Sequence, residues 1–154
     1  QSTEREQPEY AIYPKELSSP YRDSRFKVGE DMYALLGIGR DDKPARFAHL
    51  ARNFAFFDAP AAFFCFVDRQ MGPPQWSDLG MFLQTFMLLA EEAGLSTCAQ
   101  EAWANRPRAV ADFVGAGSEL MLFCGMAIGY KDDSKSVNQL VSDRAPLDTW
   151  AKFV

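Results

Sequence analysis

Few residues of this chain have the types and spacing needed for acid–base, nucleophilic or metal chemistry. His49 is the only histidine among 154 residues. Neither a second histidine nor a set of acidic ligands accompanies it, so we interpret it as a surface side chain. Cys65, Cys98 and Cys124 are an odd number, lie far apart and form no C-x-x-C pair, which is typical of reduced core cysteines. These patterns argue against a Ser-His-Asp or His-rich metal mechanism, and we expect no metal site.

Three other features suggest chemistry only in particular surroundings. Glu101 taken alone is typical of a solvated carboxylate at the end of a strand, and Arg144 taken alone is typical of a surface arginine. The two glycines of GIGR, residues 37–40, suggest a phosphate loop. However, no strand precedes them and their spacing differs from G-x-G-x-x-G, so we expect no phosphate loop there.

Composition and charge limit the classes of function. A hydrophobic content of 47% predicts a globular protein, and we interpret residues 1–154 as one domain with an extended arm at 1–27 and a core at 28–154. The net charge of −5 argues against binding to nucleic acid or to an anionic membrane surface. No apolar run approaches the roughly 20 residues of a membrane span. With no visible signal peptide and reduced cysteines, the chain is expected to be cytoplasmic.

The stretch from Ser77 to Trp103 organises the predicted fold. Between Asp78 and Glu92 apolar side chains cover most of the helix circumference, so the helix must be buried on most sides. A chain this short offers little protein to bury it, and we expect a partner subunit to form a second wall. Gly94 suits the left-handed position that ends a helix, after which LSTCAQEAW returns as a strand or extended loop.

The remaining elements surround this stretch. Apolar spacing predicts three further helices, and continuous apolar runs predict two strands buried on both faces. The helices span Val28–Leu36, Asp42–Phe57 and Arg106–Val114, and the strands span Ala61–Val67 and Leu120–Tyr130. Tyr10, Ile12, Tyr13 and Tyr21 are expected to pin the arm. Gly125 and Gly129 are expected to let a neighbouring segment approach the second strand closely.

Three blocks of sequence, in this order and at this spacing, resemble the FMN-dependent nitroreductase family, in its nitroaromatic-reducing branch. They are Gly80–Trp103, the run ELMLFCGMAIGY at Glu119–Tyr130, and the run VNQLVSDRAPL at Val137–Leu147. The resemblance implies an α+β, nitroreductase-like fold: a central mixed or antiparallel sheet flanked by helices, in an intertwined homodimer with FMN at the subunit interface.

The resemblance also implies the chemistry and the site. Hydride passes from NAD(P)H to the flavin and then to a nitroaromatic, quinone or similar aromatic acceptor, in a ping-pong cycle. No side chain is implied to be catalytic, because the flavin reacts. Ala99 and Gln100 offer backbone contacts to the pyrimidine side of the ring. Glu101 and Ala102 lie near its reactive nitrogen, with the Ala102 N–H aimed at it. Ser142 and Arg144 match the phosphate-binding position.

Two motifs of the family have no counterpart in these residues. An R-R-S-x-R phosphate motif and an N-x-Q-P-W segment precede the matching part in family members, and Arg22 and Arg25 belong to the middle arm instead. We therefore expect the N-terminal part of the fold to be missing here, through truncation or natural shortness, and FMN affinity to be lowered. The alternative hypothesis is a truncated, non-catalytic nitroreductase-like dimer that binds a ligand or a partner.

Overall fold

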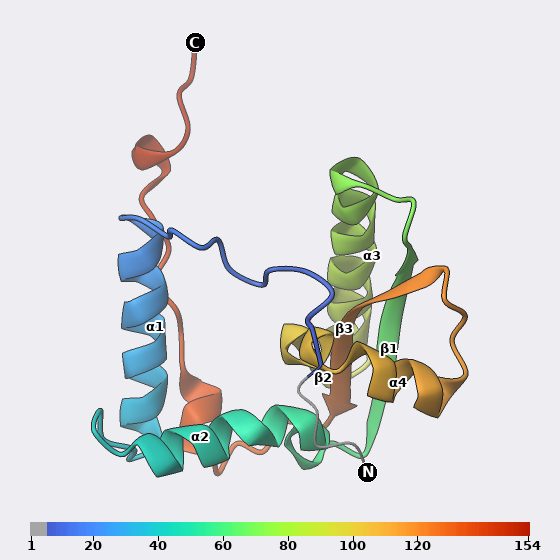
Figure 1. The fold of residues 1–154 in the computed structure, drawn as a ribbon. Coiled ribbons are helices and arrows are strands. Elements are labelled where there is room, and N and C mark those ends of the chain that lie inside the picture. The colour runs from blue at the N-terminus through green and yellow to red at the C-terminus, as the bar shows by residue number, and fades with distance from the viewer. Residues whose placement is uncertain (1–5) are drawn as a thin grey trace. The chain divides into compact units, whose positions relative to one another are not determined.

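The computed structural model describes residues 6–154, and these divide into two compact units. The first contains residues 6–15 and Phe47–Lys131, and the second contains Glu16–Arg46 and Asp132–Val154. Their boundary falls within helix α2 (Lys43–Ala51), between Arg46 and Phe47. Figure 1 shows the elements of both units, and each unit is described here by itself.

The first unit is built on a three-stranded antiparallel sheet. Strands β1 (Ala61–Asp68), β2 (Ser96–Gln100) and β3 (Leu120–Gly129) lie in the order β1-β3-β2, so β3 is central and β2 forms an edge. Most of the fully buried side chains lie on β3, including Leu122, Cys124 and Met126. The α+β class and the antiparallel sheet are therefore confirmed.

Strand β1 is less buried than its apolar run predicts. Only Cys65 is buried along it, opposite Cys124 of β3, and the first two residues, Ala61 and Ala62, are exposed. Burial on both faces is thus wrong for β1 in the single chain. The prediction of three core cysteines is also wrong in one case, because Cys98 on the edge strand is exposed.

Helix α3 (Pro73–Glu92) packs on one face of this sheet and lies beside β1 and β3 in Figure 1. Leu83 joins Cys65, Cys124 and Met126 in the core, with Phe86 and four other partly buried apolar residues around them. Gly94 ends the helix as predicted: its φ is +78°, and the N–H groups of Gly94 and Leu95 donate to Glu91 and Ala90.

The start of α3 lies before the predicted position. Pro73 is the first helical residue, and the Gln75 side chain accepts a hydrogen bond from the Gly72 N–H at 3.1 Å. Ser77, which directly precedes the helical stretch predicted from Asp78, lies inside the helix and donates its hydroxyl to the Pro73 carbonyl. Proline suits the first turn because the missing N–H would have no helical partner there.

The outward face of α3 remains apolar. In the single chain only Leu83 and Ala90 of this helix are buried. Four large apolar side chains are more than half exposed: Met81, Phe82, Leu88 and Leu89. The described residues therefore do not bury the whole helix, and its coverage by a partner subunit stays a prediction.

The single helix expected over Asp42–Phe57 is wrong. Asp42 does cap α2, since its carboxylate accepts the Ala45 N–H at 3.0 Å, but α2 ends at Ala51. A 3-10 segment follows at Arg52–Asp58, and Phe56, Phe57 and Asp58 all have positive φ. This left-handed run turns the chain into β1. Two apolar residues of this stretch, Leu50 and Phe54, are exposed.

Two short helices and the start of the arm complete the first unit. A 3-10 turn at Glu101–Asn105 leads into α4 (Pro107–Val114), which ends at the left-handed Gly115. Tyr10 pins the arm as predicted, because its hydroxyl donates to the Phe123 carbonyl and its ring lies against Trp76. The Tyr13 and Tyr21 side chains are exposed, and their pinning role stays a prediction.

The second unit centres on α1 (Tyr21–Leu35), which is longer than the helix predicted from Val28. The extended arm therefore ends at Pro20, not at Lys27. Short 3-10 segments follow in the C-terminal region at Ser136–Gln139 and Leu147–Thr149. The Ser136 hydroxyl donates to the Leu35 carbonyl, which ties that region to α1. None of the helices over residues 6–154 has the length and apolarity needed to cross a bilayer.

Candidate functional site

Residues Ala99–Ala102 form the end of an edge strand and the start of a 3-10 turn. Ala99 pairs with Met126 and Gln100 with Gly125 on one side of β2, while its other side faces no strand of this sheet. Ala99 and Glu101 are exposed. The Ala102 N–H lies in the first turn, where N–H groups have no acceptor within the helix, and no side chain caps this end. The segment can therefore present backbone groups to a flat polar ligand.

The Gln100 side chain points into the protein and not outward. It is 2% exposed, and its Nε2 donates to the carbonyl and to the side-chain oxygen of Asn53, at 2.9 and 3.3 Å. Its Oε1 is buried without a hydrogen-bond partner among the described residues. No local pattern predicts this role for the side chain, because it depends on a contact with a distant 3-10 segment.

The Glu101 carboxylate adds negative charge near two buried groups. Burial, and then the charge of Glu101, raise the pKa of Tyr10 well above its usual value. Burial, with smaller effects from Cys65 and Glu101, raises the pKa of Cys124 to about 12. Both groups are therefore neutral at pH 7, and neither is suited to act as a base or a nucleophile.

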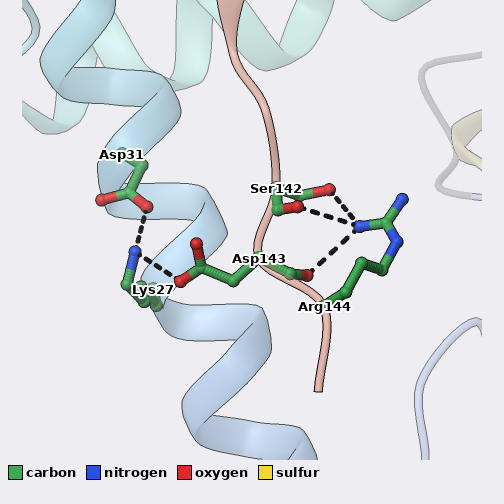
Figure 2. A network of polar contacts seen from close by, with 5 residues as sticks. All are labelled: Lys27, Asp31, Ser142, Asp143 and Arg144. Carbon is green, nitrogen blue, oxygen red and sulfur yellow. Dashed lines mark hydrogen bonds and ion pairs between the residues drawn. The ribbon is translucent and has the colours of Figure 1, made fainter. Parts of the chain in front are cut away.

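Ser142 and Arg144 lie together in the second unit (Figure 2). One guanidinium nitrogen, Nη1, donates to the Ser142 hydroxyl at 2.6 Å, to the Ser142 carbonyl at 3.1 Å and to the Asp143 carbonyl at 3.2 Å. The other end of the guanidinium points away from these oxygens. A guanidinium edge and a neighbouring hydroxyl are suitable donors for a phosphate.

Asp143, the acidic residue between Ser142 and Arg144, forms an ion pair with a lysine of another element. Asp143 pairs with Lys27 of α1 at 3.0 Å, and Lys27 also pairs with Asp31 at 2.7 Å (Figure 2). Hydrogen bonds to Asp31 and Asp143 raise the pKa of Lys27. The Asp143 carboxylate is thus turned toward a cation, which reduces its repulsion of an anion at Arg144. No local pattern predicts this contact, because it joins distant segments of the chain.

His49 and the cysteines offer no alternative centre. The His49 ring packs against Phe57 at 5.8 Å, and partial burial, with the charge of Arg52, lowers its pKa. In the part of the chain from residue 6 to 154, no group of three or more His, Cys, Asp and Glu residues is placed to hold a metal ion.

The comparison with protein families decides the relationship. The model of the nitroreductase family matches residues 6–130. The chain belongs to the nitroreductase family. A 4-nitrobenzoate reductase of Pseudomonas putida is 35% identical over 94% of this chain, and a chloronitrobenzene nitroreductase of Comamonas testosteroni is 31% identical over 96%. These alignments cover 63% and 65% of the two relatives.

Solved structures agree with this nitroreductase fold. The FMN and NADPH-dependent nitroreductase NfnB from Sphigopyxis sp. strain HMH is 46% identical, with a TM-score of 0.93 over 96% of this chain and 66% of its own. NfnB from Mycobacterium smegmatis, solved in complex with NADPH, has a TM-score of 0.90 at 24% identity, which supports the fold alone. The chain therefore spans just under two thirds of the length of these relatives.

Proposed function

We propose that this nitroreductase-family chain is part of an FMN-dependent oxidoreductase. It would pass hydride from NAD(P)H, through the flavin, to a nitroaromatic, quinone or similar acceptor. The observation that carries the proposal is the 46% identity, over 96% of the chain, to an enzyme described as FMN and NADPH-dependent. The curated relatives are named as reductases of nitrobenzoate and chloronitrobenzene, which favours a nitroaromatic acceptor.

The segment Ala99–Ala102 fits a flavin ring. Its exposed backbone at the end of β2 can pair with the polar edge of the ring, and the Ala102 N–H has no helical acceptor to compete for it. When bound, FMN supplies the acceptance and donation of hydride. A backbone donor toward the ring stabilises negative charge there without titrating, so the protein needs no acidic side chain for this task.

Ser142 and Arg144 fit the phosphate of the same cofactor. Arg144 keeps one edge of its guanidinium turned away from Ser142, and Asp143 is paired with Lys27. Because the ring and phosphate residues belong to different units, each set is proposed by itself. Each rests on its own local geometry and on the family resemblance.

Absorbance spectroscopy tests the proposed function. The purified protein, after incubation with FMN and removal of free ligand, should retain the visible absorbance bands of a bound flavin. Anaerobic NADPH or NADH should bleach these bands, and 4-nitrobenzoate should restore them. A protein that retains no FMN, or a bound flavin that no nicotinamide bleaches, would contradict the proposal.

A second copy of the chain is the proposed partner. Four large apolar side chains are exposed along α3, namely Met81, Phe82, Leu88 and Leu89, and a homodimer would cover them. Light scattering should give a dimer for the wild type, and Phe82→Glu should shift it to monomer. A wild-type monomer at micromolar concentration would refute this.

We also propose a cytoplasmic location, on the basis of the three free cysteines.

A further inference from the structure

Trp103, the residue after Ala102, is held by aromatic side chains from two other elements. Phe56 stacks on its ring with centroids 4.8 Å apart, and Phe54 and Phe64 meet it edge-on at 5.2 and 5.0 Å. The indole N–H is buried without an acceptor among residues 6–154. Packing, not hydrogen bonding, therefore fixes the position of this ring.

The Trp103 indole also packs directly on Gly125 of β3. A Cβ at this position would lie 2.4 Å from Trp103 Cδ1, 2.9 Å from Trp103 Nε1 and 3.1 Å from Phe56 Cε1. The ring therefore rests directly on the backbone of the central strand. It has no room to move toward the sheet, and the three phenylalanines surround its other sides.

Phe56 reaches this position because the backbone beneath it is left-handed. Phe56 and Phe57 have φ values of 49° and 52°, and Asp58 has 64°. Three consecutive residues without glycine in this region cost energy, and such strain persists only when the surroundings enforce it. An ion pair between Arg52 and Asp58 at 2.9 Å closes the turn.

The same turn is tied to the proposed flavin-facing segment by a second contact. Gln100 donates through Nε2 to Asn53, at the start of the strained segment. Residues 100 and 103 thus both contact the segment Arg52–Asp58, and Ala102 lies between them. From the opposite direction the Glu9 N–H donates to the Ala104 carbonyl at 3.1 Å. The backbone at Glu101 and Ala102 is therefore fixed on each side.

We propose that the strained segment Arg52–Asp58 is a positioning device for the flavin contact. Through Phe56 stacked on Trp103, and Asn53 bonded to Gln100, it sets the direction of the Ala102 N–H. Phe56 and Trp103 are positioning residues that act through the backbone and do not touch the reacting atoms. The role toward the flavin rests on the proposed function. The rigidity of the segment itself does not.

Phe56→Leu and Phe57→Leu form a matched pair for the test. Both changes remove one aromatic ring from a left-handed residue, so they alter side-chain size and backbone strain alike. Only Phe56 stacks on Trp103, whereas Phe57 packs against His49. Loss of an aromatic pair should weaken a coupled equilibrium by roughly 2- to 12-fold. If the segment positions the flavin contact, Phe56→Leu should raise the FMN dissociation constant by this factor, and Phe57→Leu should change it by less than about 2-fold.

Two measurements distinguish the outcomes. Fluorescence quenching gives the FMN dissociation constant, and visible circular dichroism of bound flavin reports whether its surroundings have changed. Hydrogen exchange in the FMN-free protein should show faster exchange of the Glu101 and Ala102 amides in Phe56→Leu than in Phe57→Leu. Equal exchange in the two variants would overturn the device. Faster exchange with unchanged FMN affinity and dichroism would overturn its role toward the flavin. A wild type that binds no FMN would overturn the proposed function and that role together, while exchange would still decide the rigidity.

Discussion

Gly125→Ala should destabilise the protein because the new methyl group has no space. Its Cβ would lie 2.4 Å from Trp103 Cδ1, and Phe54, Phe56 and Phe64 pack against the indole and resist its displacement. Inserting a methyl group into a packed core costs about 1–3 kcal/mol. Replacing glycine in a strand recovers about 0.4–1 kcal/mol through the unfolded chain. At the middle of these two ranges the free energy of unfolding should therefore fall by about 1.3 kcal/mol, and Tm by about 3–5 °C.

Urea unfolding followed by far-ultraviolet circular dichroism measures this change. Gly29→Ala is the control, since nothing lies within 4 Å of a Cβ there and helix α1 should gain stability from alanine. A Trp103→Ala background should reduce the cost of Gly125→Ala by at least about 1 kcal/mol if the two groups collide. If Gly125→Ala unfolds at the wild-type urea concentration, or if its cost is the same in both backgrounds, the close seat of the indole is refuted.

Three further predictions concern charges and thiols. Arg144→Ala should raise the FMN dissociation constant roughly 10- to 150-fold, because charge-assisted hydrogen bonds to the phosphate are lost. Lys152→Ala, the control, should leave this constant unchanged. Equal FMN titration curves for the two variants would contradict the phosphate assignment. The hydrogen bond from Arg46 lowers the pKa of the Glu30 carboxyl in the folded protein. This pair therefore stabilises the fold fully above the unfolded carboxyl pKa of about 4.3. The stabilisation is lost as the pH falls through the lower pKa that Glu30 has in the folded state. Glu30→Gln should therefore lower stability to urea at pH 7, and the gap from wild type should narrow by pH 3; a constant gap would refute the pair. Burial raises the pKa of Cys124 to about 12 and also raises the pKa of Cys65, so an aromatic disulfide reagent should modify exposed Cys98 first, and Cys65 and Cys124 only on unfolding. Burial of the thiol raises the pKa of Cys98 as well, so its reaction should be slower than that of a free thiol, and early modification of Cys124 on peptide mapping would disprove this order.

Local signals in the sequence predicted the elements well where one residue decides the conformation. Gly94 ends α3 and Gly115 ends α4, because glycine adopts the left-handed conformation at little cost. The strand over Leu120–Tyr130 and the helix over Arg106–Val114 also agree with β3 and α4. Family resemblance, and not periodicity, pointed to Ala99–Ala102 and to Ser142 with Arg144 as the cofactor-binding residues.

The errors come from contacts that no local pattern contains. The left-handed turn at Phe56–Asp58, where a helix was predicted, contains no glycine or proline that would have indicated it. Packing of Phe56 against Trp103 and Phe64 helps to stabilise this turn. Ser77 has the chemistry of an N-cap, but Pro73 with Gln75 begins the helix earlier. The pairing of Lys27 with Asp143 joins residues far apart in the sequence. Only the three-dimensional structure brings such groups together.

The strand order β1-β3-β2 also sets when the sheet can be assembled. Strands β1 and β2 do not pair with each other, and both pair with β3, which comes last in the sequence. Ala61 must wait for Ile128, and Ser96 for Gly129, before either ladder can close. While the nascent chain has emerged only as far as α4, neither β1 nor β2 has its partner β3, so the two ladders of this sheet cannot yet form. The apolar residues of β1 and α3 that pack against Cys124 and Met126 also lack that cover until Leu120–Gly129 has been synthesised.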